Sequence, residues 1–136
     1  MPGKKFKQQK GRIRGISCKG VFLCCGDCGI KSVECARIPS NQFESVISVI
    51  KKKMNRDSKL YQMVLPSCPV SKKPIGVRMG SGKGDIDHFV ANVQAGKILF
   101  ELSGFSNDVV DEIVRIANSK FSMKVKRTNL EKMYYG

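Results

Sequence analysis

Residues 85–103, DIDHFVANVQAGKILFELS, carry the clearest secondary-structure signal in the chain. Two runs, HFVANVQ at 88–94 and KILFELS at 97–103, are rich in the β-branched, aromatic and aliphatic residues that favour strands. Only Ala95 and Gly96 lie between them, and a two-residue link with glycine is typical of a β-hairpin. The sequence therefore predicts two strands joined by a hairpin turn around Ala95-Gly96.

Two amphipathic helices are predicted on either side of this hairpin. Within 39–55, PSNQFESVISVIKKKMN, apolar residues recur at steps of three and four, and Ser40 stands where an N-cap is expected. The same period follows Ser106 over 107–120, with acidic residues in the early turns that complement the helix dipole. The side chains expected to enter the core are Phe43, Val46, Ile47, Ile50 and Met54 from the first segment, and Val110, Ile113, Val114, Ala117 and Phe121 from the second.

The other predicted strands are short and interleave with the helices, at 21–25, 30–36, 59–65 and 122–128. The stretch PSCPVSKKP at 66–74 contains three prolines, which predict that it takes no part in regular pairing. Because strands and helices alternate without a strict βαβ repeat, the predicted class is α+β. We expect a mainly antiparallel sheet with two helices packed on one face.

The charge of the chain indicates its partner. Its 136 residues include 25 Lys and Arg against 11 Asp and Glu, a net charge of +14. A compact protein with this excess repels itself unless a polyanion neutralises it, so nucleic acid is the favoured partner. An anionic membrane surface is the weaker alternative, because the basic residues are spread over several segments and do not follow one amphipathic helix.

Residues 1–20 are predicted to form a basic RNA-binding arm, and residues 21–136 a single domain. The arm has seven cationic residues, no acidic ones and four glycines, so it cannot bury an apolar face and is expected to order on its partner. The opening has no apolar stretch of the signal-peptide type, which makes secretion unexpected. The six cysteines are accordingly expected to be free thiols in a reducing compartment.

The glycine-rich stretch GVRMGSGKGD at 76–85 has the glycine density of a nucleotide-binding loop but not its spacing. A P-loop needs glycine five residues before the Gly-Lys pair and a hydroxyl residue after it, where this chain has Val77 and Gly84. A strand pattern follows in place of the helix that would hold the phosphate. Nucleotide hydrolysis is therefore disfavoured. Glycines and cations together suit close contact with the phosphate backbone of a polymer.

The pair Cys25-x-x-Cys28 has the form of a zinc knuckle and supplies an alternative function, a small zinc-binding or redox module. A structural zinc site needs four ligands, and the remaining cysteines form no second pair at knuckle spacing. No predicted helix follows the pair to lower a thiol pKa, which also disfavours a redox role.

Residues 72–104, KKPIGVRMGSGKGDIDHFVANVQAGKILFELSG, resemble the signature of the ribosomal protein L-sixteen family, the bacterial and organellar form of a universal large-subunit protein. Five short motifs of that family occur here in order and at its spacing: Lys73-Pro74, 77–80, 82–84, 89–91 and 96–104. KGRIRG at 10–15 and GDCGIKSVECARIPSNQFE at 26–44 are similar as well, so the resemblance covers nearly the whole chain.

The resemblance implies a structural ribosomal protein and not an enzyme. It implies binding to large-subunit rRNA beside the aminoacyl-tRNA site, with the glycine loop toward the tRNA acceptor arm. Neighbouring large-subunit proteins are the other expected partners, and the protein is expected as one copy per ribosome. No cofactor or metal is expected. The residues expected at rRNA are Lys4, Lys5, Lys7, Lys10, Arg12, Arg14, Lys72 and Lys73, and those of the tRNA-proximal loop are Arg78, Met79, Gly80, Gly82, Lys83 and Gly84.

Three departures from the family pattern point to its lineage. Ser81 stands where a loop lysine is usual, Ala95 where a turn proline is common, and Phe89 where a tryptophan is usual. Together with the cysteines and the lysine-rich composition, they favour a mitochondrial ribosome. The start of the chain is compatible with a gene inside the organelle. A bacterial cytoplasm or a plastid is the alternative.

Overall fold

Seven strands and two helices alternate along the part of the chain that the computed structural model describes, which is residue 7, residues 11–80 and residues 82–129. The elements are β1 (Cys28–Ser32), β2 (Ala36–Pro39), α1 (Ser40–Lys52), β3 (Lys59–Gln62), β4 (Cys68–Lys72), β5 (Asp85–Val93), β6 (Ile98–Ser103), α2 (Asn107–Lys120) and β7 (Val125–Asn129). Every strand pair is antiparallel. The α+β prediction is confirmed. No described helix has the length and apolar character that crossing a bilayer requires.

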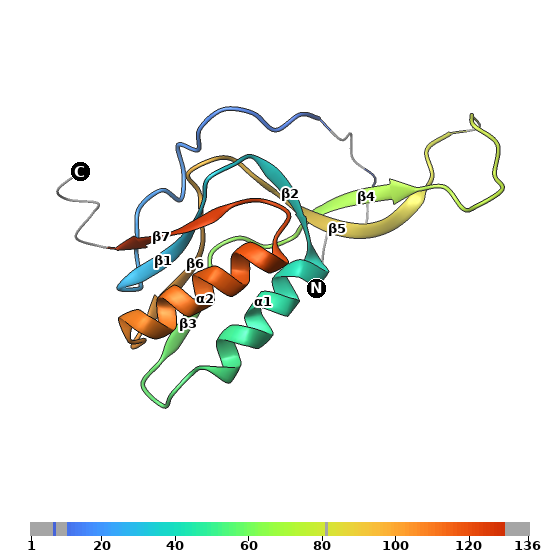
Figure 1. Cartoon of the computed structure of the whole chain (residues 1–136). Helices are drawn as coiled ribbons and strands as arrows, with labels where there is room; N and C mark the ends of the chain where they lie inside the picture. The colour runs from blue at the N-terminus through green and yellow to red at the C-terminus, as the bar shows by residue number, and fades with distance from the viewer. Residues whose placement is uncertain (1–6, 8–10, 81, 130–136) are drawn as a thin grey trace.

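The strands form two sheets, where the sequence predicted one. A four-stranded sheet has the order β3-β6-β1-β7, and a three-stranded sheet has the order β2-β5-β4. Both helices lie side by side on one side of the strands (Figure 1). A salt bridge of 3.0 Å between Lys53 Nζ and Glu112 Oε2 links the end of α1 to α2.

The predicted hairpin around Ala95-Gly96 is wrong, because β5 and β6 lie in different sheets. The backbone of the turn bonds to other segments. The Gly96 N–H donates to the Ser32 carbonyl (2.9 Å), the Ser32 N–H donates to the Lys97 carbonyl (2.9 Å), and the Ser17 N–H donates to the Ala95 carbonyl (2.9 Å). The chain therefore crosses at this turn from one sheet to the other.

Four other local predictions need correction. Residues 21–25 form no strand, and 30–36 is divided between β1 and β2. Residues 68–72, inside the proline-rich stretch, form β4, whose Pro69 is tolerated because β4 is an edge strand of its sheet. Ser40 does not cap α1: β2 runs directly into the helix, so Pro39 occupies the cap position.

The core lies between the helices and the strands and contains most of the residues that the helical periods indicated. Phe43, Val46 and Ile50 of α1 are buried, as are Val110, Ile113 and Ala117 of α2. Three rings join these layers: Phe43 meets Phe100 at 5.8 Å and Phe121 at 5.7 Å between ring centroids, edge to face in both cases. The core holds the two helices against β6 and leaves the β4–β5 end of the molecule free to project.

Candidate nucleic-acid interface

Residues 73–84, which we call the finger, connect β4 to β5, and their described part, 73–80 and 82–84, extends away from the folded body (Figure 1). The finger continues the antiparallel β4–β5 pair, and β4 is an edge strand, so among the described residues no strand pairs with its outer side. Gly76, Gly80 and Gly82 have φ angles of +87°, +100° and +94°. Side chains with a Cβ rarely adopt this region, so these glycines permit the path of the loop.

The base of the finger is narrow. A Cβ on Gly84 would lie 2.8 Å from the Lys72 carbonyl carbon and 2.8 Å from the Lys73 nitrogen. Only glycine therefore lets the backbone at residue 84 lie this close to the backbone of Lys72 and Lys73. The Lys73 ammonium donates to the carbonyl of Gly80 across the loop. These contacts draw the two sides of the loop together at its base, residues 72–73 and 83–84, which we call the neck.

The arm reaches the same neck. Lys7 Nζ donates to the Lys83 carbonyl at 3.1 Å and lies 3.7 Å from Asp85 Oδ1. Lys7 comes from the basic arm, and Lys73 and Lys83 come from the finger. The structure therefore brings cations from two distant segments to one place.

Residues 11–20 run along the folded body on the side away from the helices (Figure 1). Arg37 of β2 donates to the Gly11 carbonyl (2.5 Å), Gln94 donates to the Arg14 carbonyl (3.1 Å), and the Ile98 N–H donates to the Gly20 carbonyl (2.8 Å). The sequence did not predict these contacts between the arm and the protein. They use backbone carbonyls, so the Arg12 and Arg14 side chains remain exposed.

The predicted site residues fall into three groups. Lys4, Lys5 and Lys10 lie outside the described residues. Lys7, Lys73, Lys83 and Gly84 meet at the neck. Exposed residues are Arg12 and Arg14 on the arm, Lys72 at the end of β4, and Arg78, Met79, Gly80 and Gly82 further out on the finger.

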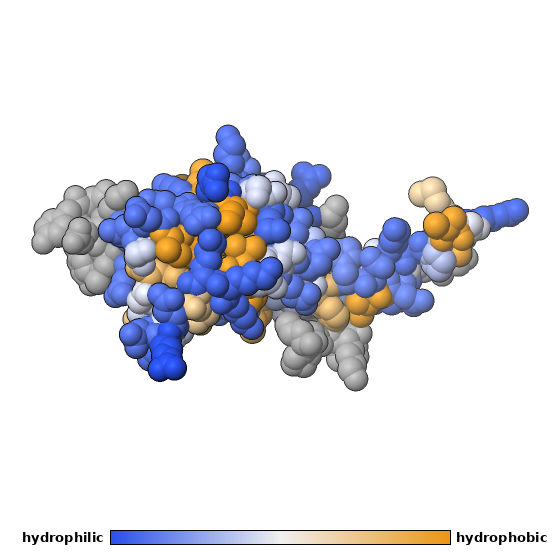
Figure 2. All heavy atoms as spheres, turned by 60° about the horizontal axis from the view of Figure 1, so that its bottom comes forward, coloured by the Kyte–Doolittle hydropathy of each residue, from blue (hydrophilic) through white to orange (hydrophobic). Residues whose placement is uncertain are grey.

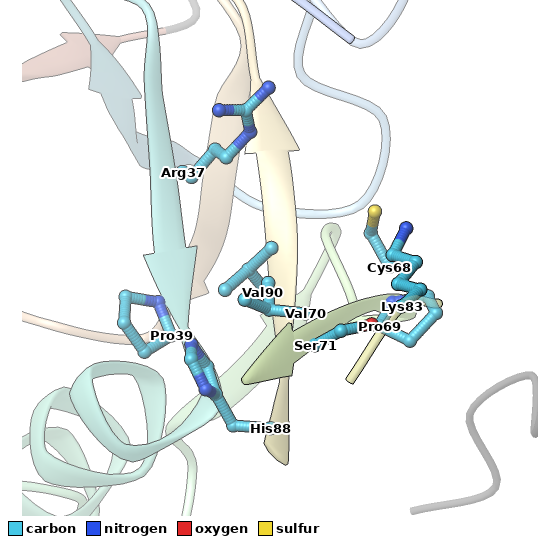
Figure 3. Close-up of a pocket in the computed structure, with 9 residues that line it drawn as sticks. All are labelled: Arg37, Pro39, Cys68, Pro69, Val70, Ser71, Lys83, His88 and Val90. Carbon is cyan, nitrogen blue, oxygen red and sulfur yellow. The ribbon is translucent and has the colours of Figure 1, made fainter. Parts of the chain in front are cut away.

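A cavity of ≈ 410 Å³ lies on the three-stranded sheet beside the neck (Figure 3). Its lining residues are Arg37, Pro39, Cys68, Pro69, Val70, Ser71, Lys83, His88 and Val90. The valines and prolines make part of its surface apolar, whereas Arg37 and Lys83 are cationic. The Ser71 hydroxyl is buried and has no hydrogen-bond partner among the described residues.

A sequence model of the family described as ribosomal protein L16p/L10e matches residues 2–128. This chain belongs to the ribosomal protein L16p/L10e family. The match confirms the resemblance found in residues 72–104 and upstream. Membership makes the chain a structural protein of the large ribosomal subunit, located at the ribosome, in a family that is generally non-enzymatic.

In this L16p/L10e-family protein, Glu101 on β6 is a buried polar residue whose role was not predicted from the sequence. The side chain is 1% exposed. Its carboxylate accepts N–H bonds from Cys24 (3.0 Å), Cys25 (2.6 Å) and Gly26 (2.9 Å). Successive backbone N–H groups form an anion-binding concavity, so Glu101 fixes the segment before β1. An acidic residue within the apolar run KILFELS was the available signal, because a buried charge needs partners.

The cysteines of this L16p/L10e-family protein give no support to the zinc or redox alternative. All six lie within the described residues, and none forms a disulfide. Cys25 is exposed, whereas Cys28 is buried in β1, where its thiol donates to the Leu102 carbonyl at 3.7 Å. Burial raises the pKa of the Cys28 thiol, with a smaller opposing effect from Arg127 and a smaller reinforcing one from Asp27. Within the described part of the chain, no group of three or more His, Cys, Asp or Glu could hold a metal ion.

Proposed function

We propose that this protein binds large-subunit rRNA with its basic arm and with Lys72 and Lys73 at the start of the finger, and helps to position the tRNA acceptor arm at the aminoacyl site with the glycine-rich part of the finger. The rRNA-binding residues of the proposal are Lys4, Lys5, Lys7, Lys10, Arg12, Arg14, Lys72 and Lys73. Those near tRNA are Arg78, Met79, Gly80, Gly82, Lys83 and Gly84. The protein acts as one copy beside other large-subunit proteins.

The observation that carries the proposal is the projecting finger in a chain of this family. Residues 73–84 contain three cationic residues, Lys73, Arg78 and Lys83, and no acidic residue, and Lys72 directly before them adds a fourth cation. The finger is exposed from Pro74 to Gly80. Cationic side chains supply affinity for phosphates, and backbone N–H groups of a glycine-rich loop can approach them closely. A projecting loop of this kind can reach a ligand that the folded body does not touch.

The arm suits a different task. Its described part is already hydrogen-bonded to the body through Gly11, Arg14 and Gly20, while the guanidinium groups of Arg12 and Arg14 are exposed. A segment that is ordered before binding loses less conformational entropy when it binds. The arm therefore supports attachment to rRNA, and the finger supports seating of tRNA. The proposed chemistry is positioning, and peptide-bond formation belongs to the RNA.

The test uses large subunits that lack this protein and are reconstituted with the full chain or a variant. Arg78→Ala is expected to co-sediment with subunits as the unchanged chain does, while tRNA affinity at the aminoacyl site falls about tenfold, the loss of one charge-assisted contact. Arg12→Ala/Arg14→Ala is expected to weaken co-sedimentation more than tRNA binding by occupied subunits. Arg115→Ala, at an exposed position on α2, is the matched control.

Equal losses of both activities in both variants would contradict the division of labour between arm and finger. Normal tRNA affinity in subunits that carry Arg78→Ala would contradict the role of the finger.

The compartment is part of the proposal. A mitochondrial ribosome is supported by Ser81, Ala95 and Phe89 at positions where the family has other residues, and by the six cysteines. A bacterial cytoplasm or a plastid is the alternative. Fractionation of cells followed by detection of the protein in sedimented ribosomes decides between them, and its recovery only from non-mitochondrial ribosomes would refute the mitochondrial assignment.

A further inference from the structure

The outer part of the finger is apolar as well as basic. Ile75 and Met79 are 100% and 99% exposed, and Val77 is 55% exposed. Figure 2 shows apolar and strongly hydrophilic surface next to one another at the outer end of the finger. Single exposed apolar residues are ordinary, but three of them in a five-residue span at the point furthest from the core indicate a contact surface.

The cations of the finger are not distributed as a purely phosphate-binding loop requires. Lys73 and Lys83 stand at the neck, where Lys73 is turned back onto the Gly80 carbonyl. Between residues 75 and 80, Arg78 is the single charged residue. A loop that met only phosphates would gain nothing from Ile75 and Met79, because phosphate oxygens bury no apolar surface.

We propose that Ile75 and Met79 pack against the face of an unpaired nucleobase of the bound RNA, while Arg78 contacts an adjacent phosphate. This inference rests on the proposed function and specifies what the finger recognises. Unpaired bases offer flat faces of low polarity, and proteins insert apolar side chains against bases in this way. The thioether of Met79 adds a favourable contact with an aromatic ring. Paired A-form RNA keeps these faces stacked inside the helix.

Charge complementarity selects RNA over a protein as the occupant of this surface. The finger residues 73–84 carry only positive charge, and Lys7 and Lys72 add two further cations at its base. An apolar surface within such a field attracts a polyanion that also exposes apolar faces. Unpaired RNA has both properties.

The test measures binding of the full chain to two RNAs of equal length, one fully paired and one with a bulge that contains the fluorescent base 2-aminopurine. The variant is Ile75→Ser/Met79→Ser, and the matched control is Phe22→Ser, which removes a side chain that is 68% exposed in the segment before β1. Because these side chains lie outside the core, unfolding curves are expected to be unchanged. Dissociation constants are measured over a range of salt concentrations.

The unchanged chain is expected to prefer the bulged RNA. The double variant should lose at least about tenfold in affinity for the bulged RNA, because exposing even one buried apolar side chain has about this effect. Its affinity for paired RNA and its salt dependence should stay the same, because no charge has been removed. The 2-aminopurine signal should change with the unchanged chain and with Phe22→Ser, but not with the double variant.

Equal losses for both RNAs, or no loss for the bulged RNA, would overturn the nucleobase contact while leaving RNA binding intact. Normal RNA binding by the double variant together with failed incorporation into subunits would also overturn it, in favour of a protein occupant. Failure of the unchanged chain to bind either RNA would instead refute the proposed function itself.

Discussion

Glu101 shows how one buried carboxylate organises a segment that has no regular structure. Residues 24–26 present three consecutive N–H groups to its two oxygens, at 2.6–3.0 Å. Charge-assisted bonds of this kind are about twice as strong as neutral ones, and they offset the cost of burying the charge. The segment between Gly20 and β1 is therefore held against β6 by this side chain, together with one backbone bond from the Asp27 N–H to the Leu102 carbonyl (3.0 Å).

Replacement of Glu101 by Ala is expected to lower the free energy of unfolding by about 3 kcal/mol, because three backbone N–H groups lose their acceptor. The loss of unfolding free energy in Glu101→Gln should be smaller than that in Glu101→Ala but not zero. Gln keeps one acceptor oxygen and places an amide donor against the N–H groups. Urea unfolding measures both values. The control is Glu44→Ala, at an exposed position on α1. A loss no larger than that of the control would show that the three bonds contribute little.

Cys28 makes stability depend on pH at the alkaline end. Burial raises the pKa of its thiol in the folded state above the ordinary value of 9.0. The folded protein then holds this proton more tightly than the unfolded chain, so the contribution is complete below the unfolded pKa and is lost as pH rises through the folded pKa. The free energy of unfolding should fall with pH above 9.0.

Measurement of that fall in the unchanged chain and in Cys28→Ala isolates the thiol from other groups that titrate in the same range. The decline should be shallower in Cys28→Ala, whereas Cys18→Ala, at an exposed position, should follow the unchanged chain. Parallel curves for all three proteins would contradict the assignment.

At the scale of the elements, an aromatic cluster joins both helices to the four-stranded sheet. Phe43 of α1 stands between Phe100 of β6 and Phe121, which directly follows α2. The Phe100 and Phe121 rings are themselves stacked at 6.4 Å. Edge-to-face contacts between rings stabilise the fold beyond the effect of burying apolar area, and they have a preferred geometry. This cluster therefore fixes the orientation of the helices.

Phe43→Ala is expected to lower the free energy of unfolding by about 3–5 kcal/mol, since it creates a cavity and removes both edge-to-face contacts. Thermal and urea unfolding measure the effect. Ile47→Ala, one turn along α1 at a half-buried position, should cost clearly less. Equal losses in the two variants would show that the cluster adds nothing beyond ordinary burial.

The neck of the finger depends on Gly84 for a steric reason that differs from that of the other finger glycines. A Cβ at Gly84 would meet the backbone of Lys72 and Lys73, whereas one at Gly82 would meet nothing within 4 Å. Gly84→Ala should therefore loosen the end of the β4–β5 pair. Gly82→Ala should leave the pair intact and strain only the loop, where φ is +94°.

Amide hydrogen exchange of Ile86 and His88 measures this difference. Both residues are in the part of β5 that pairs with β4. Exchange is expected to accelerate about tenfold or more in Gly84→Ala and to stay near that of the unchanged chain in Gly82→Ala. Equal acceleration in the two variants would remove the steric argument.

At the scale of the whole molecule, a net charge of +14 places this small protein in a polyanionic environment. The body contains a single core. Cationic residues of the arm and of the finger lie at the neck. Lys7 connects these segments through the Lys83 carbonyl and Asp85. The protein therefore brings cations from segments far apart in sequence to the base of the finger.

RNA affinity should fall steeply with salt, and the slope reports how many phosphates are neutralised. Removal of two phosphate contacts in Arg12→Ala/Arg14→Ala should reduce the slope of log K against log salt by about 1.8 on duplex RNA, taking the value of about 0.9 per contact known for duplex DNA. Filter binding over a salt series measures the slope. The Arg115→Ala control should keep the slope of the unchanged chain, and an unchanged slope in the arm variant would exclude phosphate contacts by these two arginines.

Local patterns were sufficient for much of this molecule. The three-to-four period of residues 39–55 and 107–120 predicted both helices, and the buried Phe43, Val46 and Ile50 confirm the face that was expected. Density of β-formers predicted strands at β5 and β6, and the finger motifs predicted the family that the match over residues 2–128 confirms. The zinc alternative at Cys25 and Cys28 finds no support, since Cys25 is exposed, Cys28 is buried, and no group of three or more possible ligands lies in the described part of the chain.

The sequence by itself determined the helices, most strands, the cationic surface and the family, because each depends on residues that are neighbours in the chain or on simple composition. Tertiary structure decided which strands pair, why Glu101 is buried, and how Lys7 meets the finger. Those outcomes depend on competition among distant hydrogen-bond partners. The Gly96 N–H, for example, donates to the carbonyl of Ser32, 64 residues away, and no local sequence pattern encodes that pairing.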